Sequence, residues 1–350
     1  MHVIKLTIIL TLLLITLMGC PETPTLFIGK IPVGHNPSEI IVGSTTYLKY
    51  VTVTNDNNVI VNVSNAYPNQ IIGVGKQPVG IALWQGGNRL YVVNDAGLSI
   101  SVIALSNDTL GRGDSVVDSI TNTSFHNMGD AIVTADGRYL YVATDTNAIS
   151  VISTTTDKVV TTFTDPSFKY PAHLVADALN RYIFVSESMG NAVSVISTTT
   201  NTVVKTIGVG ISPNGMAETN DGNWLFVVNS GSNSISVINT NSLSVARTVT
   251  DTSFNNPQRI ALAPECAYGF ISENNSGNIS VISQNALITG SGRAVIKDIY
   301  GGVKPYDVAV QYTGPKDSGY VIAVLKEENA IVSIDYRFIN EIFNACFQQI

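Results

Sequence analysis

Five ionisable side chains recur at one position of a repeated pattern in this chain of 350 residues. Each lies two residues after the residue that opens a short apolar segment, and this opening residue is proline in every case except one. The five are Glu39, Asp130, His173, Arg259 and Asp307. Carboxylates that face a guanidinium and an imidazole can bind a small polar ligand or a cation. The alternative is that polar residues line a water-filled channel because apolar side chains would be exposed there.

Two more histidines, His35 and His126, lie in turns that lead into such segments and are candidates for the same ligand site. The histidines do not share the spacing of metal ligands, and the cysteines do not cluster. The sequence has no phosphate-binding loop, no G-x-S-x-G motif and no H-E-x-x-H motif. It therefore predicts no catalytic residue, no metal site and no cofactor.

The overall charge makes nucleic acid an unlikely class of partner. The formal net charge is -7, and no basic cluster is present to neutralise phosphates. Only 13% of the residues are charged, whereas 45% are hydrophobic. The abundance of Val, Ile, Thr, Ser, Asn and Gly favours strands and tight turns over helices.

The elements that position the ionisable residues belong to a unit that occurs seven times. Its most regular part is an apolar strand such as "AISVIS", and the copies lie 40 to 52 residues apart. They begin at Val59, Ser99, Ala148, Ala192, Ser234, Asn278 and Ala330. A strand such as "RYLYVATD" precedes each copy, the short proline-led strand comes before that, and a fourth strand such as "KVVTTFT" follows.

Four antiparallel strands in each unit are typical of the blade of a β-propeller. Asp136-Gly137 and Asp221-Gly222 stand between the first and second strands, where a two-residue hairpin needs positive φ. Seven such units predict an all-β, seven-bladed propeller. The ring brings the recurrent position of all seven blades to the mouth of one central channel; Gly80 and Gly215 occupy it in the two blades without an ionisable residue.

The segments "RLYVVND", "RYLYVATD" and "NWLFVVNS", each followed by an "ISVI" strand, resemble the YVTN repeats of seven-bladed surface-protein propellers. The resemblance covers residues 25–336, which we treat as the propeller domain. The family includes cell-surface proteins, binding scaffolds and domains attached to redox enzymes. The resemblance therefore implies the fold and leaves the activity open.

The N-terminal segment is predicted to close the ring. Blade seven has three strands up to Tyr336, whereas "TLFIGKIPVG" from Thr25 is similar to the fourth strands of other blades. We therefore expect residues 25–33 to complete blade seven. The tail, residues 337–350, has apolar residues at helical spacing and predicts a short helix packed under the ring.

Residues 1–19 are typical of a signal peptide, with Lys5 followed by an apolar run. The residues at the end of the apolar run, Leu17-Met18-Gly19-Cys20, resemble the bacterial lipobox. This implies that Cys20 is acylated, that residues 20–24 form a tether, and that the protein is exported and anchored in a membrane. The alternative is an ordinary secretory signal with a chance cysteine.

Export would place Cys266 and Cys346 in an oxidising compartment, where a pair of cysteines can form a disulfide. The predicted topology brings the Cys266 turn and the tail to one face, one blade apart. A disulfide that pins the tail is one interpretation. The other is that Cys346 is merely an apolar residue of the predicted helix.

Three turns between blades contain a phenylalanine at an equivalent position: Phe125, Phe168 and Phe254. They are expected to hold the turns on the ring; the alternative is an aromatic contact surface. An Arg-Gly-Asp sequence at 112–114, as found in integrin ligands, is interpreted as the chemistry of an exposed loop.

Two functional hypotheses remain. The first is a lipid-anchored, extracytoplasmic, non-catalytic propeller that binds a protein or glycan in the cell envelope or serves as a scaffold. The second is an exported enzyme or redox partner, similar to lactonase or quinoprotein propellers, with its site at the channel mouth. The scarcity of catalytic residues favours the first.

Overall fold

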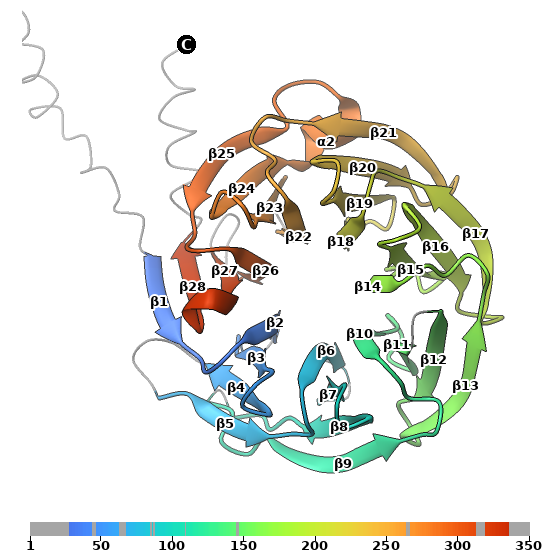
Figure 1. Cartoon of the computed structure of the whole chain (residues 1–350), viewed down its shortest axis with the longest axis vertical. Helices are drawn as coiled ribbons and strands as arrows, with labels where there is room; N and C mark the ends of the chain where they lie inside the picture. Colours follow the sequence, from blue (N-terminus) through green and yellow to red (C-terminus); the bar gives the residue numbers. More distant parts are fainter. Residues whose placement is uncertain are drawn as a thin grey trace, which may run out of the picture.

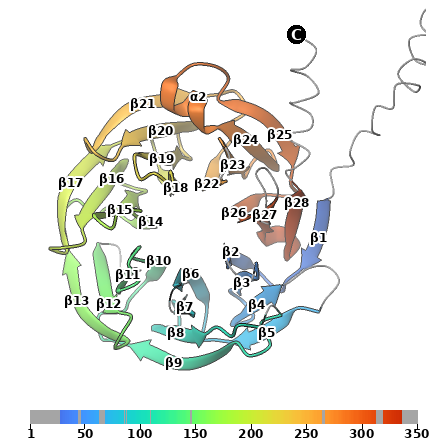
Figure 2. The same ribbon diagram turned by 180° about the vertical axis from the view of Figure 1, so that it is seen from behind.

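The computed structural model describes residues 28–43, 47–62, 68–84, 86, 88–108, 110–144, 147–263, 267–312 and 319–335. Within these ranges the chain forms seven four-stranded antiparallel sheets, arranged as blades around a central axis (Figure 1). Figure 2 shows the same ring from behind. The predicted all-β, seven-bladed propeller is thus confirmed.

Each blade runs from an innermost strand at the axis to an outermost strand at the periphery. Blade one consists of β2 (Pro37–Val42), β3 (Lys49–Val53), β4 (Asn58–Asn62) and β5 (Gln70–Gly73). Blade two consists of β6 (Pro78–Trp84), β7 (Arg89–Asn94), β8 (Ser99–Ala104) and β9 (Ser115–Thr121). Blade three consists of β10 (Met128–Val133), β11 (Tyr139–Thr144), β12 (Ala148–Ser153) and β13 (Lys158–Thr164). Blade four consists of β14 (Pro171–Ala176), β15 (Tyr182–Glu187), β16 (Ala192–Ser197) and β17 (Thr202–Gly208).

The remaining blades follow the same order, except that the last blade takes its outermost strand from the start of the chain. Blade five consists of β18 (Pro213–Glu218), β19 (Trp224–Asn229), β20 (Ser234–Asn239) and β21 (Ser244–Thr250). Blade six consists of β22 (Pro257–Leu262), β23 (Tyr268–Glu273), β24 (Asn278–Ser283) and β25 (Val295–Tyr300). Blade seven consists of β26 (Pro305–Tyr312), β27 (Gly319–Leu325), β28 (Ala330–Asp335) and β1 (Ile28–Pro32).

The pairing of β1 with β28 confirms the predicted closure of the ring. The two strands are antiparallel, with Ile28 opposite Ile334 and Pro32 opposite Ala330. Side chains of β1 alternate as they should on a half-buried edge strand: Lys30 is exposed and Ile31 is buried. Of the predicted closing segment, residues 25–27 lie outside the described part of the chain, as do the signal peptide, Cys20, Cys266 and the tail with Cys346.

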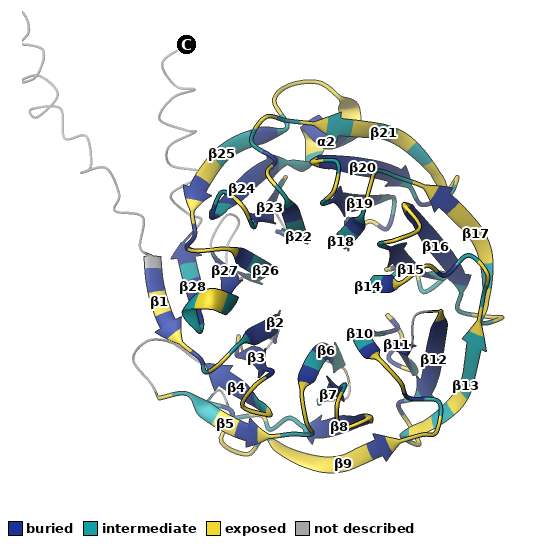
Figure 3. Cartoon of the chain, viewed as in Figure 1, coloured by how far each residue is buried: buried dark blue, intermediate teal, exposed yellow. Residues whose placement is uncertain are grey.

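The hydrophobic core lies between neighbouring blades, because one sheet has no partner of its own to cover its faces. Second and third strands are buried almost throughout, whereas the outermost strands are largely exposed (Figure 3). The cluster between blades three and four, for example, joins Tyr141 and Val151 to Leu174 and Val185. The apolar, β-branched character of the repeated strands follows from this burial on both faces.

The three phenylalanines of the turns between blades are part of these cores. Phe125 and Phe168 have no exposed surface, and Phe254 is 4% exposed. Phe168 packs in the cluster of blades three and four. Their burial supports the expected role of holding the turns on the ring and does not fit an aromatic contact surface.

We call the face that holds the starts of the seven innermost strands the mouth face. The opposite side, the far face, holds the turns that follow these strands, such as residues 134–138 in blade three. Gly137 in this turn has a positive φ of 72°, as expected. The loop is nevertheless longer than two residues, because the Thr134 N–H donates to the Tyr139 carbonyl at 2.8 Å and leaves four residues between them.

The outermost strands of blades two to six each contain a β-bulge at the same place. In blade three, Val151 pairs with Thr161 and Ile152 with Val159, so Val160 has no partner. The same register shift occurs in the other four blades. The unpaired residue is exposed in blades two to five, as Val160 is at 55%, and half-buried in blade six.

A short helix, α2 (Gln284–Thr289), follows β24 and was not predicted. The Ser283 hydroxyl accepts the N–H of Ala286 at 3.2 Å, and Gly290 ends the helix with a φ of 73°. Leu287 is buried in the core of blades five and six, which explains why a polar-looking connection folds as a helix. Among the described residues, no helix has the length and apolar character that crossing a membrane requires.

Candidate ligand site at the mouth of the central channel

A β-bulge at the start of every innermost strand positions the recurrent side chains. In blade one, Pro37 pairs with Val53 and Ile40 with Val51, so two residues stand opposite one. The other six blades show a register shift at the same point. Such bulges re-aim side chains, and here they bring the position two residues after the opening residue to the channel.

The structure brings together all five ionisable residues of this position. Glu39, Asp130, His173, Arg259 and Asp307 line one cavity of about 420 Å³ on the axis of the ring. Residues deeper in the same strands, such as Ile132 and Val175, form an apolar wall. The site is therefore a ring of five ionisable side chains, Glu39, Asp130, His173, Arg259 and Asp307, above an apolar chamber. We refer to these five as the ring residues, and to their side chains as the ring side chains.

Four ring side chains accept a backbone N–H from the next blade. The pairs are Glu39 Oε2 with Ile81 at 3.0 Å, Asp130 Oδ2 with Leu174 at 2.7 Å, His173 Nδ1 with Met216 at 3.3 Å and Asp307 Oδ2 with Ile40 at 2.9 Å. The second oxygens of Asp130 and Asp307 accept the N–H of the following residue. These bonds fix the side chains and link neighbouring blades around the axis.

Two blades have glycine at the ring position, and there the next blade approaches more closely. A Cβ atom on Gly80 would lie 2.5 Å from the carbonyl oxygen of Gly129. A Cβ atom on Gly215 would lie 2.6 Å from Cα of Arg259. Any side chain at these two positions would collide with backbone, which explains the absence of ionisable groups.

Arg259 is the cation of the ring and is 5% exposed. Its Nη1 donates to Asn214 Oδ1, while its Nη2 lies 3.8 Å from Glu39 Oε1. His173 and Asp130 show the same kind of separation, because Nε2 lies 3.8 Å from Oδ2. Both distances exceed those of a hydrogen bond, which are about 2.7–3.2 Å for N–H···O.

Burial dominates the electrostatics of the ring. It raises the pKa of Glu39 well above its usual range, with a further contribution from Asp130, and it raises the pKa of Asp130 to about 6. It also raises the pKa of Asp307, although Arg259 opposes this. Burial and then Arg259 hold the pKa of His173 well below 6.5, so its imidazole is neutral at pH 7.

Sequence reasoning missed two residues beside the ionisable ring, Tyr306 and Lys326, which contact it without lining the cavity. The Arg259 guanidinium carbon lies 5.5 Å, and the Lys326 ammonium 3.3 Å, from the centre of the Tyr306 ring. Burial, and then Arg259, lowers the pKa of Lys326 to about 8. Tyr306 could have been found as the neighbour of Asp307; Lys326 is in a 3-10 turn, η2 (Lys326–Glu328), outside the recurrent pattern.

His35 and His126 stay on the rim of the mouth face and do not line the cavity. His35 Nδ1 pairs with Asp56 Oδ1 at 2.9 Å, and its side chain is 74% exposed. His126 is also exposed. Both precede the bulge that directs side chains to the axis, so they lie in turns of the mouth face, as expected, but outside the cavity that the five ionisable residues line; a role in ligand binding stays a prediction.

The Arg-Gly-Asp sequence does not present a free carboxylate. Asp114 Oδ2 accepts the Tyr50 hydroxyl at 2.9 Å, and Oδ1 accepts the Ser106 backbone N–H at 2.7 Å. The aspartate therefore closes its own loop against blade one.

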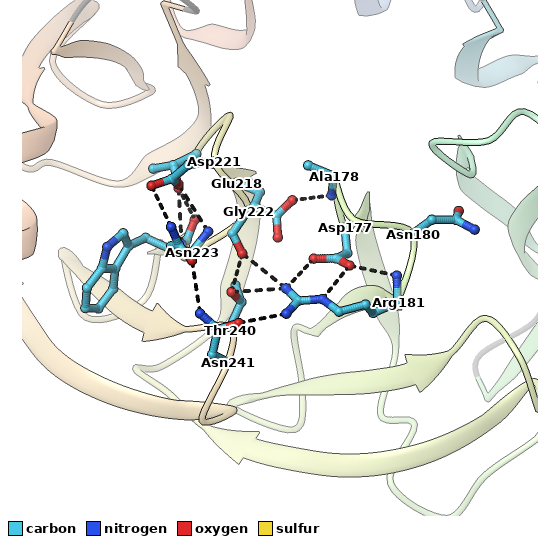
Figure 4. A network of polar contacts seen from close by, with 12 residues as sticks. Asp177, Ala178, Asn180, Arg181, Glu218, Asp221, Gly222, Asn223, Thr240 and Asn241 are labelled. Atoms are coloured by element: carbon cyan, nitrogen blue, oxygen red, sulfur yellow. Dashed lines mark hydrogen bonds and ion pairs between the residues drawn. The ribbon is translucent and has the colours of Figure 1, made fainter.

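A second polar cluster lies on the far face, at the boundary of blades four and five (Figure 4). Arg181 Nη2 donates to Asp177 Oδ1 at 2.7 Å, and Nε donates to Oδ2 at 2.9 Å. Arg181 Nη1 reaches Asn241 Oδ1 of blade five at 2.8 Å. Glu218 Oε2 accepts the Ala178 N–H at 2.6 Å, and burial together with Asp177 raises the pKa of Glu218 to about 8. We assign this cluster a structural role, because the Arg181 guanidinium bonds to Asp177 of its own blade and to Asn241 of the next, although Glu218 Oε1 and Asn180 Oδ1 are buried without a hydrogen-bond partner.

The arrangement of the chain is similar to that of several solved propellers of low sequence identity. Kuenenia stuttgartiensis hydrazine synthase superposes with a TM-score of 0.73 at 17% identity, over 91% of this chain and 98% of that one. Virginiamycin B lyase from Staphylococcus aureus gives 0.70 at 14% identity, over 89% and 99%. The Myceliophteria thermophila Cps50 (Swd1) β-propeller domain gives 0.69 at 12% identity, over 87% and 98%.

At such identities these similarities establish the fold alone. No protein-family model matches the sequence, and no curated protein matches it significantly. Two of the similar structures are named as enzymes and one as a propeller domain, so they do not decide between catalysis and binding.

Proposed function

We propose that the chain is a lipid-anchored, extracytoplasmic β-propeller that acts as a non-catalytic binding protein, with the central cavity as its ligand site. The observation that carries this proposal is that the ionisable side chains at the channel mouth do two things at once: they bond to the next blade and they line a cavity. The ring carboxylates and imidazole are held by backbone N–H groups of the next blade, and they also line one cavity at the channel mouth. Side chains fixed in this way are pre-organised for recognition.

The same bonds argue against the competing proposal of an exported enzyme or redox partner. A general base needs a free lone pair within reach of the substrate proton. His173 Nδ1 has a single lone pair, which the Met216 N–H occupies, so this nitrogen cannot act as the base. The oxygens of Asp130 and Asp307 each accept one backbone N–H and keep a second lone pair, with which they can still accept a ligand hydroxyl. Hydroxyl and thiol nucleophiles do not occur among the residues that line the described cavity.

The lipid anchor rests on the lipobox-like residues that end at Cys20. The path of the chain is compatible with it. Strand β1 runs toward the mouth face, because Pro32 leads through residues 33–36 to Pro37 at the start of β2. Ile28 therefore lies on the far face, so the described chain begins on the side opposite the channel mouth.

The anchor is tested by expressing the chain and its Cys20→Ala variant with a radiolabelled fatty acid and fractionating the cells. We expect label and membrane retention for the wild type only. Label in the variant, or no label in either protein, would contradict lipidation.

The binding role is tested by screening the full chain for thermal stabilisation against neutral, anionic and cationic small molecules. We expect at least one class to stabilise the protein and to be recovered chemically unchanged, as judged by mass spectrometry. Recovery of a converted compound would support the enzyme instead, and stabilisation by no compound would contradict a ligand site in the cavity.

A further inference from the structure

We infer that the ligand of the central cavity is a neutral, polyhydroxylated molecule of the size of a sugar unit, either free or at the end of a glycan. This inference rests on the proposed function, because it names the ligand class of the same site. It is drawn from two donor–acceptor pairs in the ring, from the balance of charges and from the apolar wall below.

The first pair is His173 with Asp130. Because a backbone N–H is always a donor, the bond from Met216 requires Nδ1 of His173 to be the acceptor. The proton of the neutral imidazole is therefore on Nε2. This N–H lies 3.8 Å from Asp130 Oδ2, too far for a direct hydrogen bond, so a donor and an acceptor face the cavity side by side.

The second pair is Arg259 with Glu39. Nη2 of Arg259 lies 3.8 Å from Glu39 Oε1, again too far for a direct bond. The guanidinium itself is held in place through Nη1 by Asn214. A hydroxyl group can accept one hydrogen bond and donate one, so a single O–H beside each pair would satisfy a donor and an acceptor together.

The two pairs lie on opposite sides of the channel. His173 and Asp130 belong to blades four and three, whereas Arg259 and Glu39 belong to blades six and one. One hydroxyl group satisfies one donor and one acceptor, so a ligand that satisfies both pairs needs two hydroxyl groups. A ring that carries hydroxyl groups on opposite edges can bind both, and its C–H faces can pack on the apolar wall of Ile132 and Val175.

The charges of the ring oppose a charged ligand. The lining holds groups of both signs, so an anion near Arg259 would also meet the carboxyl groups of Glu39, Asp130 and Asp307, and a cation near these groups would also meet Arg259. Within the described residues, no three carboxylates, imidazoles or thiols are grouped as metal ligands. The cavity of about 420 Å³ lies within the range of about 300–1,000 Å³ that is common for small-molecule sites.

The test is isothermal titration calorimetry on the full chain, purified in a polyoxyethylene detergent, since sugar-headed detergents would compete. The probes are neutral mono- and disaccharides, with glucosamine and glucuronate as cationic and anionic counterparts of glucose, and a neutral glycan that ends in the best sugar. We expect saturable binding of a neutral sugar and at least about tenfold weaker binding of its charged counterparts. Tighter binding of the glycan than of the free sugar identifies the glycan as the source.

Two variants connect binding to the pairs. Arg259→Met removes the donors of one pair. His173→Asn keeps an acceptor near Nδ1 for the Met216 N–H but removes the Nε2 donor of the other. Each is expected to weaken binding about 10- to 100-fold, as the loss of a hydrogen bond to a buried group predicts. Arg138→Ala on the far face, whose side chain is 77% exposed, is the matched control and should bind as the wild type does.

Binding of a charged ligand in preference to every neutral sugar would overturn the inference while leaving the binding role intact. Unchanged sugar affinity of the folded His173→Asn protein would likewise overturn the inference and leave the binding role intact. If no ligand of any class binds the wild type, the proposed function fails together with the inference.

Discussion

The carboxylate of Glu187 accepts the backbone N–H of Lys169 at 2.6 Å and so ties the end of a second strand to the turn that leads into its own blade. Glu273 does the same for the N–H of Asn255 at 2.7 Å. Both glutamates are completely buried, and the Oε1 atom of each is without a hydrogen-bond partner. The turn that leads into blade five is "GVG" instead. There Asn229 occupies the position equivalent to Glu187 and Glu273, and its Oδ1 accepts the N–H of Gly210.

The first prediction concerns pH. Burial raises the pKa of both Glu187 and Glu273 to about 7 from an ordinary value of 4.5. Between these values the folded protein binds more protons than the unfolded chain. The stability contributed by the protonated form is therefore complete below pH 4.5 and is lost as pH rises through 7. Each glutamate accounts for a loss on the order of 2–3 kcal/mol.

The double variant Glu187→Gln, Glu273→Gln cannot titrate at these sites. We expect its free energy of unfolding in urea to fall less between pH 4.5 and pH 7.5 than that of the wild type. The neighbouring charged groups, Asp165 and Lys169 at Glu187, and Asp251 and Asp298 at Glu273, are present in both proteins. Glu327→Gln, at a side chain that is 52% exposed, is the control and should keep the wild-type profile. Identical profiles for wild type and double variant would refute the assignment.

The second prediction concerns the glycines of the ring. Gly80→Ala and Gly215→Ala place a Cβ atom 2.5–2.6 Å from backbone atoms of the next blade. Since backbone cannot yield as a side chain does, each variant should be destabilised by about 1–3 kcal/mol. Gly208→Ala is the matched control, because its Cβ atom meets nothing within 4 Å. Thermal unfolding of the three variants checks the prediction, and equal midpoints would contradict it.

The third prediction concerns the cluster of the far face. Arg181→Ala leaves the Asp177 carboxylate, whose side chain has no exposed surface, without its cation. Because the Arg181 side chain is 29% exposed, the pair is partly screened by solvent, and loss of the cation should destabilise the protein by about 1–3 kcal/mol. Arg181→Lys should recover only part of this, because an ammonium cannot form both bonds to Asp177. Urea unfolding gives the free energies; a loss no larger than that of the surface variant Arg138→Ala would count against the cluster.

The fourth prediction concerns ring closure. Ile31 in β1 packs in the core between blades seven and one. Ile31→Asp puts a carboxylate into this core and should reduce stability by at least about 3 kcal/mol. The neighbouring Lys30→Gln alters only a half-exposed ion pair with Glu328, and its effect should stay below about 1 kcal/mol. Limited proteolysis should cut the Ile31→Asp chain in all blades, since the opened ring loses its closure; cleavage confined to blade seven would contradict this.

Much of the fold could be predicted from the sequence, because the repeat carries it. Each blade contributes the same four strands, so equivalence between blades was enough to place Glu39, Asp130 and Asp307 around one axis. The closing role of the N-terminal strand followed from its similarity to the other outermost strands.

What could not be predicted depends on contacts between blades. The tautomer of His173 is set by the backbone of Met216, which no periodicity reveals. Lys326 reaches the site from a turn of blade seven that departs from the other turns. His35 and His126 share the right face with the ring residues, but they precede the bulge that would direct them inward. Helix α2 depends on the burial of Ala286 and Leu287 between blades, which the repeat does not reveal.

The bulges of the outermost strands have a consequence for how these molecules behave side by side. A propeller offers strand edges around its whole circumference, and each edge is a template on which the strand of a second molecule can add. At Val117, Val160 and Val204 the ladder of free N–H and C=O groups is interrupted, so an incoming strand cannot keep its register. We therefore expect the protein to remain dispersed when it is crowded on a surface, with no polymerisation through its edges.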